Sequence, residues 1–556
     1  MQTLLGFVLA MSLTMVLIPL LIRWAAPLGF LDQPEARKVH TTPVPRVGGI
    51  AMTLSVLLVL LIWGLRTPAT QALWAGIAIL CVFGVWDDRK SLRSAPKFAG
   101  QALAALVMMG WGGLSISSLT LGERVMLPGW IAQPLTFMFL VGCTNAFNLA
   151  DGLDGLAGGM ATLCLCGTAL MAYTVGNNMV GSVAVLMVGT LIGFLRFNTH
   201  PARVFMGDAG SQMLGFCAAV LVLLLTQDQQ TPLSTALPLL LLGMPIIDTL
   251  MVMSVRLLLG RSPFLADRRH IHHRLLTLNF EHWEAVSLLY LLQAVLLVAA
   301  WYLRYDSDLA VGVFFGSFSL LTLVTIRLAQ FADVQVRPGV VPTDTIVLSR
   351  VPQAPSAASA QLIRAVGSST LAAALALYAL WVLATGALAS RDVQLLAVVL
   401  AVVLFAGLYW GRDRPDAGWT DRLALYSCAA LALFVSKHGL GDGIGPAGGV
   451  AGLHPQRFEM IVFPVLALAM VISLRSSRNQ PFRLTPLDIL VLLIVVTVPN
   501  LPDSIASTRS LGLTIAELVL LFYALEALTL TAGPRWRWVN GSAAVFLIGL
   551  VVRAVV

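Results

Sequence analysis

Charged side chains are scarce in this sequence. Of its 556 residues, 35 are Lys or Arg and 27 are Asp or Glu, so that 11% are charged while 58% are hydrophobic. Soluble domains average about 25% charged residues. The low charge excludes an ordinary soluble protein, and the composition is typical of an all-α, polytopic integral membrane protein.

Cysteine is also rare, and its placement does not indicate disulfides. A thiol within an apolar run is ordinarily buried and unreactive. All six cysteines lie in or beside such runs: Cys81, Cys143, Cys164, Cys166, Cys217 and Cys428. We therefore expect buried thiols rather than disulfides or a cysteine-bound metal.

A dense basic region is absent, although the net charge is +8. The Lys and Arg residues fall in alternate loops, which is the pattern of cytoplasmic loops in membrane proteins. This pattern argues against nucleic acid as a partner and predicts that the basic loops face the cytoplasm. Because no Lys or Arg precedes the first apolar run, we expect a spanning helix with an outside N-terminus rather than a cleavable signal peptide.

The apolar runs divide the chain into two modules. Residues 1–328 contain about eleven runs of the roughly 20 residues that a spanning helix needs, and residues 366–556 contain about seven more. Residues 329–365 form the longest polar interruption, rich in Pro, Ser and Ala, and are predicted to be a cytoplasmic linker. The sequence lacks an evident internal repeat and with it the inverted-repeat signature of transporters.

The first polar segments of the first module contain cations and then carboxylates. In residues 31–50, Lys38, His40 and Arg46 are candidate contacts for a nucleotide or a phosphate. The alternative is a basic loop without function that only follows the positive-inside rule. Asp87 and Asp88 end the third apolar run. Adjacent carboxylates can share a proton or bind a divalent cation, and a solvated helix end is the alternative.

Residues 144–159, TNAFNLADGLDGLAGG, contain a polar stripe. Asn145, Asn148, Asp151 and Asp154 follow one another at intervals of three residues, at which side chains on a helix are neighbours. All four can converge only if the helix breaks, which the glycines from Gly152 onward permit. Oxygen ligands of this kind favour Mg²⁺ or Mn²⁺ over zinc, and a polar turn without function is the alternative.

Two further segments complete the set. In residues 196–216, Asp208 stands between glycines before an apolar run, where it indicates an anion-binding helix start or a simple helix N-cap. In residues 260–280, His270, His272 and His273 are flanked by arginines. We expect these histidines to contact phosphates rather than to ligate a metal.

An outside N-terminus and eleven spans would place all five segments on the cytoplasmic side. They could then form one site at the membrane boundary, acidic for a metal and basic for phosphates. Phosphoryl transfer between a soluble nucleotide and a lipid phosphate requires both. A transporter, the alternative from another class, would have ionisable residues at mid-membrane and broken helices there.

The polar segments together resemble the polyprenyl-phosphate N-acetylhexosamine-1-phosphate transferases, which are glycosyltransferases of family 4. The matching pieces are RKVHTTPVPRVGG, WDD, NAFNLADGLDGLAGG, NTHPARVFMGDAGS, PIIDTL and DRRHIHHRLL, in this order within residues 1–328. The HIHH form resembles the branch that uses UDP-N-acetylglucosamine (UDP-GlcNAc), whereas the branch for phospho-N-acetylmuramoyl-pentapeptide has three adjacent histidines. The resemblance does not extend to residues 366–556.

The resemblance implies a reaction in the cytoplasmic (inner) membrane of a bacterium. GlcNAc-1-phosphate would pass from UDP-GlcNAc to undecaprenyl phosphate with release of UMP, which initiates a cell-envelope polysaccharide such as O-antigen. Mg²⁺ or Mn²⁺ would be the cofactor. Another donor, such as UDP-N-acetylgalactosamine or UDP-MurNAc-pentapeptide, is the closest alternative. Single or double displacement stays open, as does a homodimer.

Roles for particular residues also follow from the resemblance. Asp208 is implied as the first metal ligand and Asn148 as the second, while Asp87 and Asp88 match an acidic pair that acts on the lipid phosphate. The other implied site residues would contact the metal, nucleotide, phosphates or sugar: Asp151, Asp154, Asn145, Phe205, Lys38, His40, Arg46, His270, His272 and His273. Asp248, within PIIDTL, is two turns from Arg256, and a structural ion pair between the two is the reading that assigns it no function.

Overall fold

The structure is a computed structural model that describes residues 2–33, 42–63, 66–90, 92–228, 230–258, 260, 270–332 and 357–385, with scattered residues between 397 and 549. The chain forms two compact units. The first comprises residues 1–344 with 485–490, and the second comprises residues 345–484 and 491–556. The division falls within the predicted linker, of which residues 333–356 lie outside the described part.

The first unit is built from helices joined by short turns, as its composition predicts. Its described helices are α1 (Gln2–Leu28), α2 (Gly48–Trp63), α3 (Pro68–Lys90), α4 (Ser94–Gly110), α5 (Gly129–Ala150), α6 (Leu156–Thr174), α7 (Asn178–Asn198), α8 (Gly207–Thr226), α9 (Pro238–Leu241), α10 (Gly243–Leu258), α11 (Ile271–Thr277), α12 (His282–Tyr302) and α13 (Asp308–Phe331). Two antiparallel strand pairs accompany them: β1 (Leu31–Asp32) with β2 (Val44–Pro45), and β3 (Ser118–Leu121) with β4 (Glu123–Met126). In the second unit, α14 spans Ala357–Thr385.

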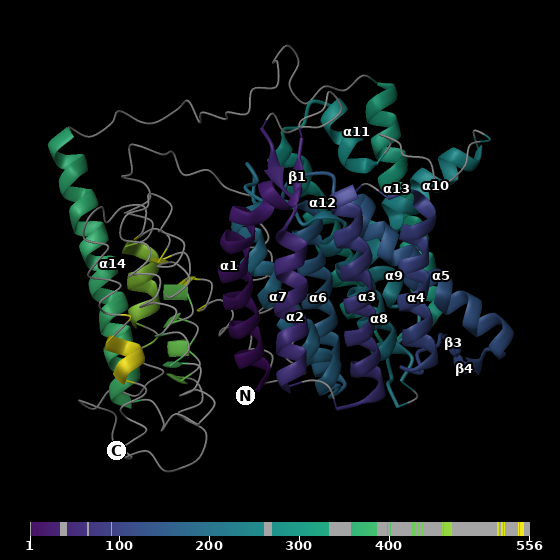
Figure 1. Ribbon diagram of the computed structural model, residues 1–556, viewed down its shortest axis with the longest axis horizontal. Coiled ribbons are helices and arrows are strands. Elements are labelled where there is room, and N and C mark those ends of the chain that lie inside the picture. The colour runs from purple at the N-terminus through teal and green to yellow at the C-terminus, as the bar shows by residue number, and fades with distance from the viewer. Residues whose placement is uncertain are drawn as a thin grey trace. The chain divides into compact units, whose positions relative to one another are not determined.

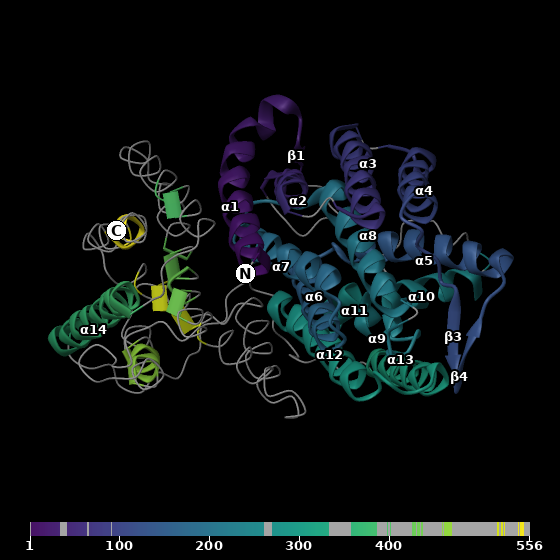
Figure 2. The ribbon, with the colours of Figure 1, turned by 90° about the horizontal axis from the view of Figure 1, so that it is seen from below.

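Helix α8 is the centre of the first unit. In the 18-residue apolar stretch of α8, 94% of the residues are buried. The helix packs against α2, α3, α5 and α6, which surround it in Figures 1 and 2. Because lipid is as apolar as leucine, helices in a membrane associate through close contacts of small residues. A Cβ on Gly84 of α3 would lie 2.4 Å from the Cα of Ala209, and one on Gly215 of α8 would lie 2.6 Å from the carbonyl oxygen of Cys143.

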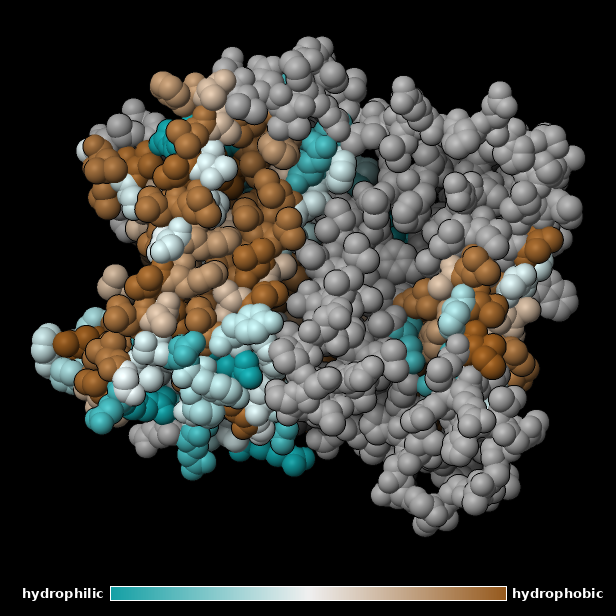
Figure 3. Space-filling view, turned by 180° about the vertical axis from the view of Figure 1, so that it is seen from behind, coloured by the Kyte–Doolittle hydropathy of each residue, from teal (hydrophilic) through white to brown (hydrophobic). Residues whose placement is uncertain are grey.

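Seven of the described helices are long and apolar enough to cross a membrane: α1, α3, α6, α7, α8, α12 and α13. They confirm the prediction of an all-α, polytopic integral membrane protein, while the totals of eleven and seven spans stay a prediction. Figure 3 shows apolar side chains over the middle of the first unit and hydrophilic ones gathered at its lower edge. All six cysteines are free thiols. Four are buried, as expected, whereas Cys81 and Cys166 are half-buried.

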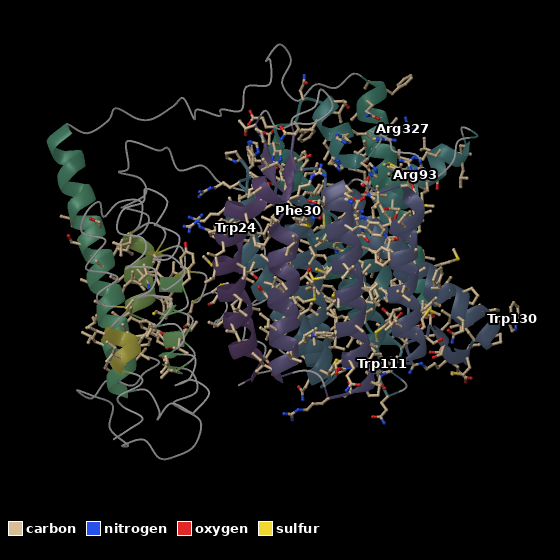
Figure 4. The ribbon with its side chains drawn as sticks, viewed as in Figure 1. Trp24, Phe30, Arg93, Trp111, Trp130 and Arg327 are labelled. Carbon is tan, nitrogen blue, oxygen red and sulfur yellow. The ribbon has the colours of Figure 1, made fainter. Side chains whose placement is uncertain are left out.

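The two ends of the first unit contain different elements. One end contains β1, β2 and α11, and Arg93 and Arg327 lie there in Figure 4, whereas Trp111 lies at the opposite end. At that opposite end, Asp308 is buried at the start of α13. Its carboxylate accepts hydrogen bonds from the hydroxyls of Ser234 and Thr235 and from the backbone amide of Thr120, and it thereby connects three segments.

We expect Gly215→Ala to destabilise the fold. The new methyl group would overlap backbone atoms of α5, and overpacking of this kind costs about 1–3 kcal/mol. The measurement is the midpoint of thermal unfolding in detergent. Gly142→Ala on α5 is the matched control, because a Cβ there meets nothing within 4 Å. Equal midpoints for the two variants would contradict the close contact between α5 and α8.

Candidate active site

Polar side chains converge at the end of the first unit where α3 and α5 finish and α8 begins. These helices come from distant parts of the sequence, yet α3 and α5 each pack against α8. The carboxyl end of α3 contributes Asp87 and Asp88, the first turn of α8 contributes Asp208, and the last turns of α5 contribute Asn145 and Asn148. The structure therefore assembles three of the five predicted polar segments directly around the start of α8.

Asp88 caps helix α8. The contact at Gly84 brings α3 against α8, and one turn later Oδ1 and Oδ2 of Asp88 accept the backbone amides of Asp208 (2.9 Å) and Ala209 (3.2 Å). Gly207 has a φ of +66°, and a Cβ there would lie 2.5 Å from the Asp88 carboxylate oxygens. The amides of a helix start attract anions. Two of these amides, which the sequence offers to a substrate, are thus bonded to a carboxylate of the chain itself.

A lysine lies between two carboxylates of the site. Nζ of Lys97, in the first turn of α4, is 2.6 Å from Oδ2 of Asp87 and 3.0 Å from Oδ2 of Asp208. Oδ1 of Asp87 accepts the backbone amide of Leu92. Carboxylates so close to one another repel, and the ammonium group of Lys97 balances that repulsion. The electrostatics at this point favour a cation.

Amide side chains complete the surroundings of Asp208. Its Oδ2 accepts hydrogen bonds from Nε2 of Gln212 (3.1 Å) and Nδ2 of Asn148 (3.4 Å). Oδ1 of Asn148 accepts the hydroxyl of Ser211 at 3.1 Å. Asn148 therefore lies next to Asp208, as predicted for a shared metal, but turns its amide nitrogen rather than its carbonyl oxygen toward the carboxylate.

Asn145 lies one helical turn before Asn148 and belongs to the same hydrogen-bond network. Its Nδ2 donates to Oε1 of Gln101 at 2.6 Å, and Nε2 of Gln101 donates to Oδ1 of Asn145 and to Oε1 of Gln212, both at 3.3 Å. Gln101 and Gln212 are buried, so their hydrogen bonds are not exchanged for water. Asn145 accordingly supports the network and lies further from the site than Asn148.

The helix breaks between α5 and α6, as the glycines of the polar stripe predict. Gly155 closes the turn with a φ of +79°, in the left-handed region that favours glycine. The carboxylate of Asp151 in this turn forms no hydrogen bond with the described residues. Burial, together with the nearby carboxylates of Asp208 and Asp88, raises the pKa of Asp151 to about 8. A bound cation would relieve this accumulation of negative charge.

Asp154 is engaged differently. Its Oδ2 accepts Nδ1 of His200 (2.7 Å) and the backbone amide of Ala202 (3.0 Å). Burial would raise the pKa of Asp154, but the hydrogen bonds from His200 and Ala202 outweigh it and hold the pKa below its ordinary value. Ligand atoms of Asp154, His200 and His282 lie within 4.8 Å of one another, as in a metal site. The two imidazoles are stacked 4.3 Å apart, however, which fits a hydrogen-bonded cluster that anchors the loop before α8.

The loop that follows β2 lies against the loop that precedes α8. The amide of Phe205 donates to the carbonyl oxygen of Pro45 at 2.8 Å, and the amide of Gly48 donates to the carbonyl oxygen of Phe205 at 2.9 Å. Arg46 forms an ion pair with Asp32 of β1, and its charge acts on the carboxylates of the site. Arg46 and Phe205 are thus brought together, whereas Lys38 and His40 lie outside the described residues.

The histidine segment is held by Asp248. Oδ2 of Asp248 accepts Nδ1 of His270 at 2.8 Å, and Oδ1 accepts the backbone amide of Ile271 at 2.7 Å. The expected role of Asp248 as partner of Arg256 is replaced by these contacts, in which both carboxylate oxygens are used. His272 is 2% exposed, and a Cβ on Gly152 would lie 2.3 Å from its Nε2. Burial lowers the pKa of His272 to about 3, so this ring is neutral and packs against the Asp151 turn.

His273 follows in the same helix, with its ring 4.3 Å from that of His272. The segment therefore reaches the site through His272 and the Gly152 turn. The residues that sequence reasoning left out are Lys97, Gln101, Gln212 and His200, and Asp248 is considered there only for an ion pair with Arg256. In the sequence, Lys97 resembles the other basic residues of the cytoplasmic loops. Only its position, nine residues after Asp88 and at the start of the next helix, indicates that its side chain lies near the acidic pair.

Comparison with known proteins identifies the family of the chain. Residues 70–226, from α3 to the end of α8, match the family model of glycosyl transferase family 4. The chain is 36% identical over 301 residues to a probable undecaprenyl-phosphate N-acetylglucosaminyl 1-phosphate transferase of Bacillus subtilis, covering 53% of this chain and 83% of that protein.

Two other relatives extend the similarity. An undecaprenyl-phosphate alpha-N-acetylglucosaminyl 1-phosphate transferase of Yersinia pestis is 32% identical over 278 residues, covering 49% of this chain and 76% of the relative. A decaprenyl-phosphate N-acetylglucosaminephosphotransferase of Mycobacterium leprae is 32% identical over 289 residues, covering 46% and 73%. With most of each relative matched and the acidic site within the matched helices, the chain belongs to glycosyl transferase family 4.

Proposed function

We propose that the chain transfers GlcNAc-1-phosphate from UDP-GlcNAc to undecaprenyl phosphate and releases UMP. The observation that carries the proposal is the cluster of Asp87, Lys97 and Asp208 at one end of a membrane helix bundle, where acidic groups and a cation meet beside lipid. The relatives' names, which specify transfer of N-acetylglucosaminyl 1-phosphate to a polyprenyl phosphate, support it.

Mg²⁺ or Mn²⁺ is the cofactor that the donor atoms fit. Asp208 would hold the metal through a carboxylate oxygen and Asn148 through its carbonyl oxygen, while Asp151 offers a further carboxylate without a hydrogen bond among the described residues. Hard cations prefer such oxygen ligands, and the position of the Lys97 ammonium supports a cation here. The metal would neutralise charge on the pyrophosphate.

Direct displacement by the lipid phosphate is the mechanism that we favour. A phosphate monoester has a second pKa of about 6 and is already an anion near pH 7, so it needs positioning and charge neutralisation. A two-step route would need an exposed carboxylate nucleophile. Asp88 has both oxygens on backbone amides, and Asp87 is bonded to Lys97 and Leu92, which disfavours either as that nucleophile.

The same arrangement supports an orientation in the membrane. We place the site at the cytoplasmic face of the bacterial inner membrane, with the N-terminus outside, because a nucleotide sugar is supplied in the cytoplasm. The last turn of α3 carries Arg89 and Lys90 next to the acidic pair, which fits the positive-inside rule. All described site residues lie within residues 1–328, so we assign the reaction to that module.

The nucleotide released from UDP-GlcNAc tests the reaction. Purified protein, undecaprenyl phosphate and Mg²⁺ are incubated with UDP-GlcNAc, and the products are separated by chromatography. UMP is the expected product. UDP would mean plain glycosyl transfer and would overturn the proposal, and turnover with UDP-N-acetylgalactosamine but not UDP-GlcNAc would overturn the choice of sugar.

Asp208→Asn is expected to abolish turnover, because an amide in place of the carboxylate removes the charge that holds the metal and breaks the contact with Lys97. The measurement is UMP release as a function of Mg²⁺ concentration. Asp306→Asn, an exposed position on the loop before α13, is the control and should retain wild-type activity. Undiminished turnover of Asp208→Asn at saturating Mg²⁺ would refute the metal assignment.

Lys97→Met is expected to lower kcat by about 10²- to 10³-fold, the usual effect of removing a group that stabilises charge in a transition state. The variant leaves Asp87 and Asp208 without their shared cation and removes a positive charge from the place where the lipid phosphate must approach. Steady-state kinetics with both substrates measures the effect. Lys90→Met, an exposed lysine in the same region, is the control, and a similar loss in both variants would argue for a general charge effect.

A further inference from the structure

The sequence places Asp248 in the interior of α10, where a carboxylate is costly in an apolar environment. Asp248 is 8% exposed, and His270, which it contacts, is 4% exposed. The two residues are separated by 22 positions, and among the described residues the Asp248 carboxylate accepts hydrogen bonds from Nδ1 of His270 and the amide of Ile271. A buried carboxylate with two such donors fixes the position of whatever it binds.

The hydrogen bond from Nδ1 determines which nitrogen of His270 remains for a ligand. A neutral imidazole has one N–H and one lone pair, and the partner of one nitrogen sets the state of the other. With its proton on Nδ1 and directed at Asp248, His270 presents Nε2, which makes no hydrogen bond within the described residues. The amide of Ile271, the first residue of α11, prevents the carboxylate from turning away.

The neighbouring His272 has a different task. Its ring lies parallel to that of His270, at 5.7 Å between centroids, but it is neutral and packed against Gly152. The stack therefore confines the ring plane of His270 from one side while Asp248 fixes its edge. His270 is held on two sides, and its Nε2 is the atom with a defined direction.

We propose that Asp248 is a positioning residue that fixes the tautomer and orientation of His270, so that the lone pair on Nε2 of His270 accepts a hydrogen bond from a sugar hydroxyl of the nucleotide donor. The inference rests on the proposed function for the identity of that donor. It replaces the expected structural ion pair with a role in the reaction. Carboxylates that orient a functional imidazole typically alter activity by about 10- to 100-fold when they are removed.

A double-mutant cycle tests the coupling. His270→Asn keeps a side-chain N–H at the place of Nδ1, so that Asp248 remains bonded, but it removes Nε2. Asp248→Asn keeps the shape of the carboxylate but cannot accept from both His270 and Ile271 without turning its own N–H₂ toward one of them. Each single variant should lower kcat/KM for UDP-GlcNAc by about 10-fold or more, with the KM for undecaprenyl phosphate unchanged.

The double variant separates positioning from structure. If Asp248 acts through Nε2 of His270, adding Asp248→Asn to His270→Asn should change kcat/KM by less than about twofold, because coupled residues are not additive. Losses that multiply, or wild-type activity of Asp248→Asn, would overturn the proposal. An increase in the KM for undecaprenyl phosphate equal to that for UDP-GlcNAc would indicate a general structural defect and would overturn it too.

Asp308→Asn is the matched control, since Asp308 is also a buried carboxylate with both oxygens engaged but lies at the opposite end of the unit. It should lower thermal stability and leave kcat/KM per folded molecule near the wild-type value. The same cycle is measured on the dissociation constant of UDP-GlcNAc without lipid. The binding measurement tests the coupling between Asp248 and His270 independently of which nucleotide is released in turnover. Release of UDP would therefore refute the proposed transfer reaction but not the coupling.

Discussion

The bond between the Asp88 carboxylate and the first amides of α8 is the interaction on which the site depends. It fixes the end of α3 to the start of the most buried helix of the first unit. A helix start has unpaired amides that need an acceptor, and a carboxylate near lipid needs donors. Each group satisfies the other, and the pair positions Asp208 and the neighbouring Asp87 within reach of one lysine.

The remaining charges follow from that position. Asp208 and Asp87 gather negative charge next to the buried Asp151, and the chain offsets part of it with Lys97 from α4 and Arg46 from the loop after β2. The amides of Gln212 and Asn148 supply further donors to the same oxygen. The balance is incomplete at Asp151, whose carboxylate forms no hydrogen bond with the described residues.

The sequence alone predicts the class of fold and most of the acidic site, because apolar runs and polar stripes are local patterns. The break of the helix after Asn148 and the convergence of Asp87, Asp88 and Asp208 follow from glycine spacing and topology. The pairing of Lys97 with Asp87 does not, since it depends on how α4 folds back against α3. The contact between Asp248 and His270 could not be predicted either, because a carboxylate 22 residues from a histidine has no local signature.

The burial of α8 has a consequence for the membrane around the protein. In the apolar stretch of α8, 94% of the residues are buried inside the protein, whereas the value for α13 is 22%. Lipid therefore contacts the outer helices and scarcely contacts α8. Differences in bilayer thickness are met by tilt and local deformation of lipid-facing segments. Asp208, at the start of α8, is therefore insulated from such adjustments, and the depth of the site is set by protein packing rather than by the bilayer.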